Sequence, residues 1–245
     1  MIIVSNLNTT FFNSMLDPVT SFVRGMFTSI LIISILCFPA TASVPSSVQS
    51  VPMPGESATI LVYGDSISAA YGMKREQGWV QLLTKRLKTQ EPAYDVINAS
   101  VSGETTGGGV VRLPKTLQIH QPDLVILELG GNDGLRGYPI DKIQRNLDSM
   151  INSIRATGAD VLLVGMVLPP NYGRRYTKAF EGIFSHIAEK YGLVFVPHFL
   201  EGVSTQESLL QADGIHPTPE AQSLLLDDIW PALESILIEQ DSADE

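Results

Sequence analysis

TILVYGDSIS, residues 59–68, joins a short apolar run rich in β-branched residues to a small polar turn. The run Thr59–Tyr63 predicts a buried strand, and the turn carries Ser66 past its carboxyl end. In an open parallel α/β sheet, the loops at the carboxyl ends of the strands face the ligand crevice. Ser66 is therefore a candidate nucleophile. Ser and Asp residues after a strand also commonly cap the next helix, so a purely structural role for this serine stays open.

The rest of the chain repeats this strand pattern and alternates it with helices. Apolar runs rich in Val, Ile and Leu, without polar alternation, occupy residues 58–63, 94–98, 123–129, 160–168 and 193–196. Between them, apolar residues recur at helical spacing in three sets, which are Trp79, Leu82, Leu83 and Leu87, then Ile143, Leu147, Ile151 and Ile154, then Phe180, Ile183, Phe184 and Ile187. The alternation predicts a three-layer α/β/α sandwich around a five-stranded, parallel, doubly wound sheet of the flavodoxin-like type.

Two predicted helices contain residues that disturb a helix. The segment 106–117 includes Gly107-Gly108-Gly109, and the last helix, residues 218–238, contains Pro231. Proline removes a helical hydrogen bond, so we expect a bend or a break at that residue.

The sequence divides into four segments. Met26–Pro39 is an apolar run too short to span a bilayer comfortably, preceded by Arg24 and followed by the cleavage pattern Ala40-Thr41-Ala42. It predicts a signal peptide over residues 1–42, starting at Met1 or Met15, and export to the periplasm or medium after cleavage near Ala42. An uncleaved membrane anchor is the alternative. We expect a flexible lead-in over residues 43–57, one hydrolase domain over 58–238 and a disordered acidic tail over 239–245.

Composition narrows the possible ligands. The only cysteine, Cys37, lies inside the predicted signal, so the mature chain would have no disulfide, thiolate metal site or cysteine nucleophile. The formal net charge of −10 disfavours nucleic acid and anionic membranes as partners. No metal or cofactor is expected, because ligand clusters are absent from the sequence. We therefore expect a monomer without stable membrane insertion after signal cleavage, which acts on small amphiphilic acyl substrates.

Polar residues follow three of the predicted strands. Ser66 follows the first strand, Gly103 the second and Asn132 the third, so all three converge on one edge of the sheet. Acyl transfer needs such a set, namely a hydroxyl that attacks and N–H donors where negative charge develops on the carbonyl oxygen. A glycine lets its backbone N–H approach a substrate, and an Asn side chain adds a neutral donor. Ordinary turn roles for Gly103 and Asn132 stay open.

The general base would be one of four histidines, His120, His186, His198 and His216. His120 precedes a strand and His186 lies within a helix, so both are expected away from this edge. His216 occurs in Asp213-Gly214-Ile215-His216-Pro217, where one short loop could supply both the imidazole and the carboxylate that orients it. His198 follows the fifth strand and is a competitor, although no carboxylate stands close before it. We favour His216.

Four blocks of sequence together resemble a known family. Gly64-Asp65-Ser66, Gly103, Gly130-Gly131-Asn132-Asp133 and Asp213-Gly214-Ile215-His216 are similar, in the same order, to the conserved blocks of the SGNH hydrolases, also called GDSL esterases. The resemblance covers nearly all of the predicted domain and implies the SGNH hydrolase fold. It also implies that Ser66 is the nucleophile, His216 the general base and Asp213 its orienting acid. The backbone N–H groups of Ser66 and Gly103 and the side chain of Asn132 would form the oxyanion hole.

Two loops point to the substrate class. Residues 127–137 and 168–176 are similar to those of the bacterial periplasmic group of acyl-CoA thioesterases, lysophospholipases and arylesterases (TesA type). The loops 134–139 and 168–176 follow strands and should border the site. Their candidate substrate-binding residues are Leu135, Tyr138, Pro169 and Tyr172, and Arg136, Arg174 and Arg175 accompany them. An apolar lip with cationic spots suits an acyl chain that carries a polar or anionic head. We predict a serine esterase and thioesterase, with a carbohydrate-ester deacetylase or a non-catalytic lipid- or sugar-binding module as alternatives.

Overall fold

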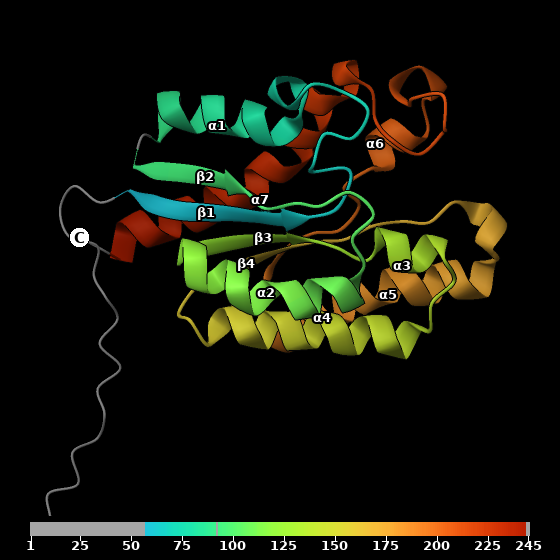
Figure 1. Cartoon of the computed structure of the whole chain (residues 1–245), viewed down its shortest axis with the longest axis horizontal. Helices are drawn as coiled ribbons and strands as arrows, with labels where there is room; N and C mark the ends of the chain where they lie inside the picture. Colours follow the sequence, from blue (N-terminus) through green and yellow to red (C-terminus); the bar gives the residue numbers. More distant parts are fainter. Residues whose placement is uncertain (1–56, 92, 244–245) are drawn as a thin grey trace, which may run out of the picture. The chain divides into compact units, whose positions relative to one another are not determined.

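The centre of the computed structural model is one parallel sheet, and the model describes residues 57–91 and 93–243 (Figure 1). Its strands are β1 (Ala58–Gly64), β2 (Tyr94–Asn98), β3 (Leu124–Glu128), β4 (Asp160–Val164) and β5 (Val194–Val196). The strand order is β2-β1-β3-β4-β5, and every neighbouring pair is parallel. This is the flavodoxin-like order, so the prediction of the sheet is confirmed.

The long helices cover both faces of this sheet, because successive residues of a strand point to opposite sides. Ile60 and Val62 pack in one core with residues of α1 (Trp79–Gln90) and α7 (Gln222–Ala243). Leu61 and Tyr63 pack in a second core with residues of α2 (Thr106–His120), α4 (Ile140–Arg155) and α5 (Arg174–Tyr191). Figure 1 shows α1 on one side of the sheet and α2 and α4 on the other. The fold is therefore the predicted α/β/α sandwich.

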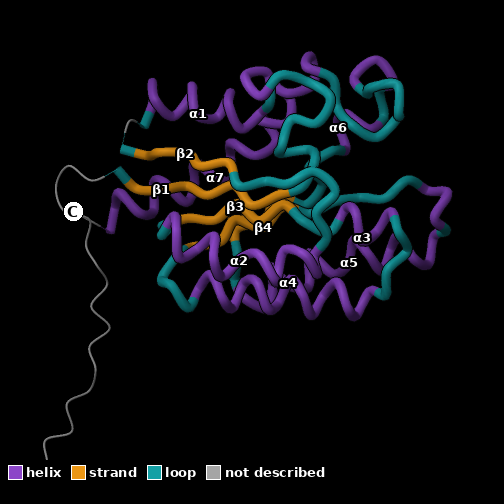
Figure 2. Tube along the Cα trace, in the orientation of Figure 1, coloured by secondary structure: helices purple, strands orange, loops and turns teal. Residues whose placement is uncertain are grey.

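Short helices gather near the carboxyl ends of the strands, where Figure 2 shows α3 and α6 among long loops. These short elements are η1 (Arg75–Gln77), α3 (Gly131–Leu135), η2 (Pro170–Tyr172), α6 (Glu201–Ser204), η3 (Glu207–Leu209) and η4 (Pro219–Ala221). Along the chain, β2 is added on one side of β1 and β3 on the other. This reversal of direction places a topological switch point between β1 and β3, the position where ligands bind in open α/β sheets.

The first turn of α2 is held by a cap and lies close to the sheet at Gly109. The Thr105 side chain caps the helix by accepting a hydrogen bond of 3.2 Å from the Gly108 N–H. At Gly109, a side-chain Cβ would lie 2.7 Å from Leu129 and 3.0 Å from Met150. The Gly109 carbonyl also accepts a 2.7 Å hydrogen bond from the Tyr63 hydroxyl of β1. The small residue here therefore permits close packing of helix on strand.

The fourth strand is shorter than the sequence pattern predicts. The apolar run continues to residue 168, but β4 ends at Val164. Both neighbours of β4 end at the same level, β3 at Glu128 and β5 at Val196. Pro197 follows β5 and has no N–H to extend the ladder. Beyond Val164 the apolar run therefore forms a loop at the carboxyl ends of the strands, where Ser66 also lies.

The last helix is unbroken and ends later than predicted. α7 continues through Pro231, where we expected a bend or a break, and extends to Ala243. The prediction of a disordered tail from residue 239 is therefore wrong for residues 239–243. Gln240 explains part of this difference, because its side-chain amide donates a 2.9 Å hydrogen bond to Asp160 and accepts one of 3.3 Å from the Tyr94 hydroxyl.

The predicted signal peptide, residues 1–42, lies outside the described residues, as does the lead-in except for Ser57. Within residues 57–91 and 93–243, no helix is both long and apolar enough to cross a membrane.

Candidate active site

Ser66, His216 and Asp213 form a continuous hydrogen-bonded chain of side chains. The Ser66 Oγ lies 2.9 Å from the His216 Nε2, although 150 residues separate the two in the sequence. The other ring nitrogen, Nδ1, lies 2.7 Å from the Asp213 Oδ2. Ser66 is 8% exposed, so its hydroxyl lies at the boundary between the core and the solvent. The structure thus brings together the nucleophile, base and acid that the sequence analysis selected.

A tight loop fixes Asp213 beside His216. The second carboxylate oxygen of Asp213, Oδ1, accepts the backbone N–H groups of Ile215 at 2.9 Å and His216 at 3.0 Å. Gly214 has a φ of +69°, a left-handed conformation that favours glycine. The hydrogen bond from the His216 N–H, together with that of its side chain, lowers the pKa of Asp213 to about 2. The acid is therefore ionised across the neutral range and can stabilise a protonated imidazole.

The turn after β1 is capped by Asp65 and not by Ser66. The Asp65 Oδ1 accepts a 3.0 Å hydrogen bond from the Ile67 N–H. The Ser66 hydroxyl meets the His216 ring instead. The next helical element, η1, begins only at Arg75, so Ser66 does not cap a helix, and its side chain faces the imidazole.

Asn132 lies beside this turn, at the start of the short helix α3. Gly130, before the helix, has a φ of +126°, and this conformation turns the chain from β3 into α3. The Asn132 Nδ2 donates a 3.0 Å hydrogen bond to the Asp65 Oδ2. An amide nitrogen carries two hydrogens, so one remains to donate to a substrate. The residue before Ser66 is thereby joined to Asn132.

Gly103 lies in the exposed loop after β2. Its φ is +79°, and a Cβ on it would meet no atom within 4 Å, so the backbone conformation rather than space favours glycine. The loop is joined to β1 because the Val101 N–H donates a 3.0 Å hydrogen bond to the Gly64 carbonyl. The Gly103 carbonyl accepts a 3.4 Å hydrogen bond from Arg136.

The three other histidines lie apart from Ser66. The His198 ring pairs with Glu201 at 3.1 Å, and its side chain is 49% exposed. His120 ends α2, whose C-terminus leads into the amino end of β3, and His186 is an exposed residue within α5. Among the described residues, no group of three or more His, Cys, Asp or Glu side chains could hold a metal ion.

Comparison with known proteins assigns the chain to a family. A model of the GDSL-like lipase/acylhydrolase family matches residues 62–224, which include Ser66, Asn132, Asp213 and His216. The chain belongs to this family.

Relatives of this GDSL-like hydrolase include curated esterases and a solved structure. Esterase TesA of Pseudomonas aeruginosa is 52% identical over 73% of this chain and 89% of its own length. Thioesterase 1/protease 1/lysophospholipase L1 of Escherichia coli K12 is 40% identical over 71% of this chain and 81% of its own length. The crystal structure of the esterase EstA from Pseudoalteromonas sp., inhibited by monoethylphosphonate, has a TM-score of 0.70 and 40% identity over 73% of this chain and 98% of that one.

The predicted substrate-binding residues of this GDSL-like hydrolase lie in two loops that contact each other. The Tyr172 hydroxyl donates a 3.0 Å hydrogen bond to the Leu135 carbonyl, and the Tyr176 hydroxyl donates one of 2.7 Å to the Tyr138 carbonyl. Pro169 is exposed directly before η2. These hydrogen bonds hold η2 against the end of α3, and the start of α5 against the loop between α3 and α4.

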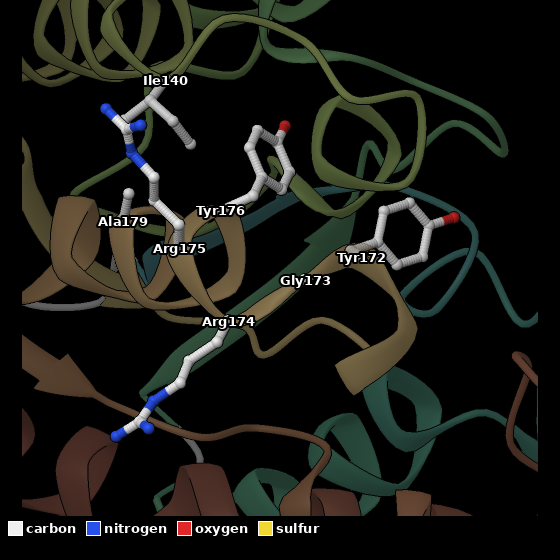
Figure 3. Close-up of a pocket in the computed structure, with 7 residues that line it drawn as sticks. All are labelled: Ile140, Tyr172, Gly173, Arg174, Arg175, Tyr176 and Ala179. Carbon is white, nitrogen blue, oxygen red and sulfur yellow. The ribbon is translucent and has the colours of Figure 1, made fainter.

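A hollow of about 550 Å³ lies beside these loops (Figure 3). It is lined by Ile140, Tyr172, Gly173, Arg174, Arg175, Tyr176 and Ala179. Tyr172 is the one predicted substrate-binding residue in this set, and Ser66 is not part of the lining. Figure 3 shows Arg174 and Arg175 pointing in opposite directions, so their guanidinium groups do not form one anion site.

Sequence reasoning missed two residues that contact the nucleophile turn and its partners. The Tyr71 ring packs on the His216 ring, with 4.4 Å between their centroids, and Glu128 lies under the turn between Gly64 and Ser68. Tyr71 is an isolated aromatic residue in a loop, which carries no signal in a sequence. Glu128 did leave a signal, because it is an acidic residue within the otherwise apolar run 124–129.

Proposed function

We propose that this hydrolase is a serine esterase and thioesterase that works through an acyl-serine intermediate on Ser66. The hydrogen-bonded chain from Ser66 through His216 to Asp213, with distances of 2.9 Å and 2.7 Å, supports this proposal. The Ser66 hydroxyl is within reach of a general base, and the base is itself oriented by a carboxylate that is ionised at neutral pH.

The reaction would proceed in two steps. His216 takes the proton of Ser66 as the hydroxyl oxygen attacks the ester or thioester carbonyl, and the protonated imidazole then gives this proton to the leaving alcohol or thiol. Water next attacks the acyl-serine as His216 takes its proton, and the imidazolium returns this proton to the Ser66 Oγ as the acid is released. In both steps negative charge develops on the former carbonyl oxygen. The Ser66 and Gly103 N–H groups and the Asn132 amide would stabilise this oxyanion.

Replacing Asn132 with Ala should lower kcat by about 10²- to 10³-fold and change KM little, because an oxyanion donor acts mainly in the transition state. The measurement is steady-state hydrolysis of a nitrophenyl ester. Asn152→Ala on the exposed face of α4 is a matched control and should keep wild-type turnover. Wild-type turnover by Asn132→Ala would contradict the role of this amide.

The proposed substrates are small amphiphilic acyl compounds, namely acyl-CoA, lysophospholipid and aryl esters. Apolar side chains on the site loops support this choice, since Tyr71 is 49% exposed and Ile215 is 44% exposed beside His216. An exposed apolar rim suits an acyl chain. The names of the two curated relatives, an esterase and a thioesterase/lysophospholipase, agree with it. We propose that the protein acts as a monomer.

One comparison of substrates tests the proposed function. Equal amounts of enzyme are given a medium-chain nitrophenyl ester, a long-chain acyl-CoA and an acetylated sugar, and kcat/KM is measured for each. We expect hydrolysis of the first two at a kcat/KM at least tenfold above that for the acetylated sugar. A marked preference for the acetylated sugar would instead identify a carbohydrate-ester deacetylase.

We also propose that the enzyme is exported, to the periplasm or the medium, after cleavage near Ala42. The apolar run Met26–Pro39 and the pattern Ala40-Thr41-Ala42 support this proposal. Identification of the N-terminal peptide of the purified protein tests it, since a mature chain that retains residue 30 would rule out cleavage.

A further inference from the structure

Two acidic side chains are buried side by side beneath the proposed nucleophile. Asp65 is 3% exposed and Glu128 is fully buried. Glu128 is the last residue of β3, and Asp65 directly follows Gly64 of β1, which is in register with Glu128. In the described part of the chain, neither carboxyl group forms an ion pair with a Lys or Arg side chain. Buried acids without a cation are costly unless a specific arrangement of donors holds them.

Glu128 uses a single oxygen to hold the turn that carries Ser66. Its Oε2 accepts a 2.6 Å hydrogen bond from the Ser68 hydroxyl and one of 3.2 Å from the Asp65 N–H. Its other oxygen, Oε1, is buried and has no hydrogen-bond partner among the described residues. Gly64 leaves room for this carboxyl, since a Cβ there would overlap the Glu128 Oε2. One acceptor oxygen is therefore all that the turn requires of this side chain.

Asp65 differs, because both of its oxygens accept hydrogen bonds. Oδ1 accepts the Ile67 N–H at 3.0 Å, and Oδ2 accepts the Asn132 amide at 3.0 Å. Because a carboxylate oxygen only accepts, the second bond requires the Asn132 NH₂ group, and not its carbonyl oxygen, to face Asp65. The NH₂ group therefore points toward the turn that carries Ser66. Two acceptors at two positions are therefore required of Asp65.

The charges around the pair are consistent with this difference. Burial raises the pKa of Asp65 to about 6. Among the charged groups around it, His216 lowers this pKa and Asp133 raises it. Burial, and then the nearby Asp65, raises the pKa of Glu128 well above its ordinary value. Two buried carboxyls this close do not both ionise readily. Burial and the neighbouring Asp65 carboxyl therefore both favour the protonated form of Glu128.

We infer that Glu128 is a positioning residue that supports the nucleophile turn through one acceptor oxygen, and that Asp65 is a positioning residue that aims the Asn132 amide through a second acceptor. This inference rests on the proposed function, in which Asn132 is an oxyanion donor. It explains the acid before Ser66 and the buried acid of β3 together, as two supports of one site.

Two replacements of an acid by its amide separate these roles. Asp65→Asn keeps the size of the side chain but has a single acceptor oxygen, so either Ile67 or Asn132 loses its partner. We expect kcat to fall at least tenfold with little change in KM. Glu128→Ala should also lower kcat at least tenfold, because two donors lose their acceptor. Glu128→Gln retains the one oxygen that is used, so it should recover most of the turnover that Glu128→Ala loses.

Equal loss in folded Glu128→Gln and Glu128→Ala would overturn the role of Glu128 as an acceptor through one oxygen. Wild-type kcat in Asp65→Asn would overturn the role of Asp65. If Asp65→Asn does not fold, Asp65→Ser replaces it, since a serine hydroxyl can still cap the Ile67 N–H but is too short to hold Asn132. Folding is checked by circular dichroism before each assay.

A double-mutant cycle distinguishes failure of this inference from failure of the proposed function. If Asp65 acts through Asn132, then Asp65→Asn combined with Asn132→Ala should be no slower than Asn132→Ala alone. Additive losses would mean that Asp65 acts on folding or on another group, and would overturn the inference. Full turnover by Asn132→Ala would instead reject the proposed oxyanion hole.

The pH dependence of stability gives a readout that is independent of activity. An acid whose pKa is higher in the folded state binds more protons there, so the stability it contributes falls as the pH rises above its unfolded pKa. A glutamine does not titrate, so Glu128→Gln should not lose this stability as the pH rises. We expect its Tm to exceed that of the wild type by about 2 °C or more at pH 8, with a smaller difference at pH 5. A Tm difference that does not grow with pH would contradict a raised pKa of Glu128.

Discussion

Ser66→Ala should lower the turnover of nitrophenyl esters by about 10⁴- to 10⁶-fold and leave the fold intact. Turnover requires the Ser66 Oγ, because the proposed mechanism bonds the acyl group to this atom. The fold does not require it, since Asp65 caps the turn and the Ser66 hydroxyl meets only His216 among the side-chain contacts of the described residues. Steady-state kinetics and a thermal melt measure the two quantities on the same preparation.

A matched variant and a covalent probe complete this experiment. Ser185→Ala, on an exposed position of α5, should retain wild-type turnover. A monoethylphosphonate-forming reagent should add its mass to a peptide that contains Ser66 in the wild type, and to no peptide in Ser66→Ala. The solved relative EstA was crystallised with this inhibitor. Turnover by Ser66→Ala above about one per cent of wild type would contradict the assignment of the nucleophile.

Much of the fold could be predicted because strands buried on both faces leave a simple pattern in the sequence. β1 and β3 consist largely of apolar residues, Glu128 excepted, because each has a helical layer on both sides. The pattern could not locate the end of β4, because a strand ends where its neighbours do, and the neighbours are β3 and β5. It also could not predict the helical residues 239–243, which are supported by the contacts of Gln240 with Asp160 and Tyr94.

The residues of the candidate site could be predicted where their type and local spacing indicate their chemical role. A serine directly after a strand indicates a nucleophile, and an acid three residues before a histidine indicates a base with its orienting acid. These patterns can be recognised although the serine is far from the other two residues in the sequence. The positions of Tyr71 and Asp65 relative to these residues carry no such signature. Tyr71 reaches His216 across 145 residues of sequence, and the contact of Asp65 with Asn132 depends on the register of β1 and β3. Only the folded chain defines these contacts.

His216→Ala should lower kcat for the same ester by about 10⁴-fold or more, because Ser66 then lacks a general base. The effect should match that of Ser66→Ala, and the double variant should be no slower than either single variant, since nucleophile and base act as one unit. The quantity measured is kcat for all three variants at a pH where the wild type is fully active. Strictly additive losses would mean that the two residues act independently.

His198→Ala is the matched control, because this histidine also follows a strand and also pairs with a carboxylate. Its ring contacts Glu201 at 3.1 Å and not Ser66, and its side chain is 49% exposed. We expect turnover within about twofold of wild type, as for a surface substitution. A large loss of turnover in His198→Ala, together with retained turnover in His216→Ala, would identify His198 and not His216 as the general base. The distinction is one of geometry: both imidazoles have an acid, but only that of His216 also has the hydroxyl of Ser66 at 2.9 Å.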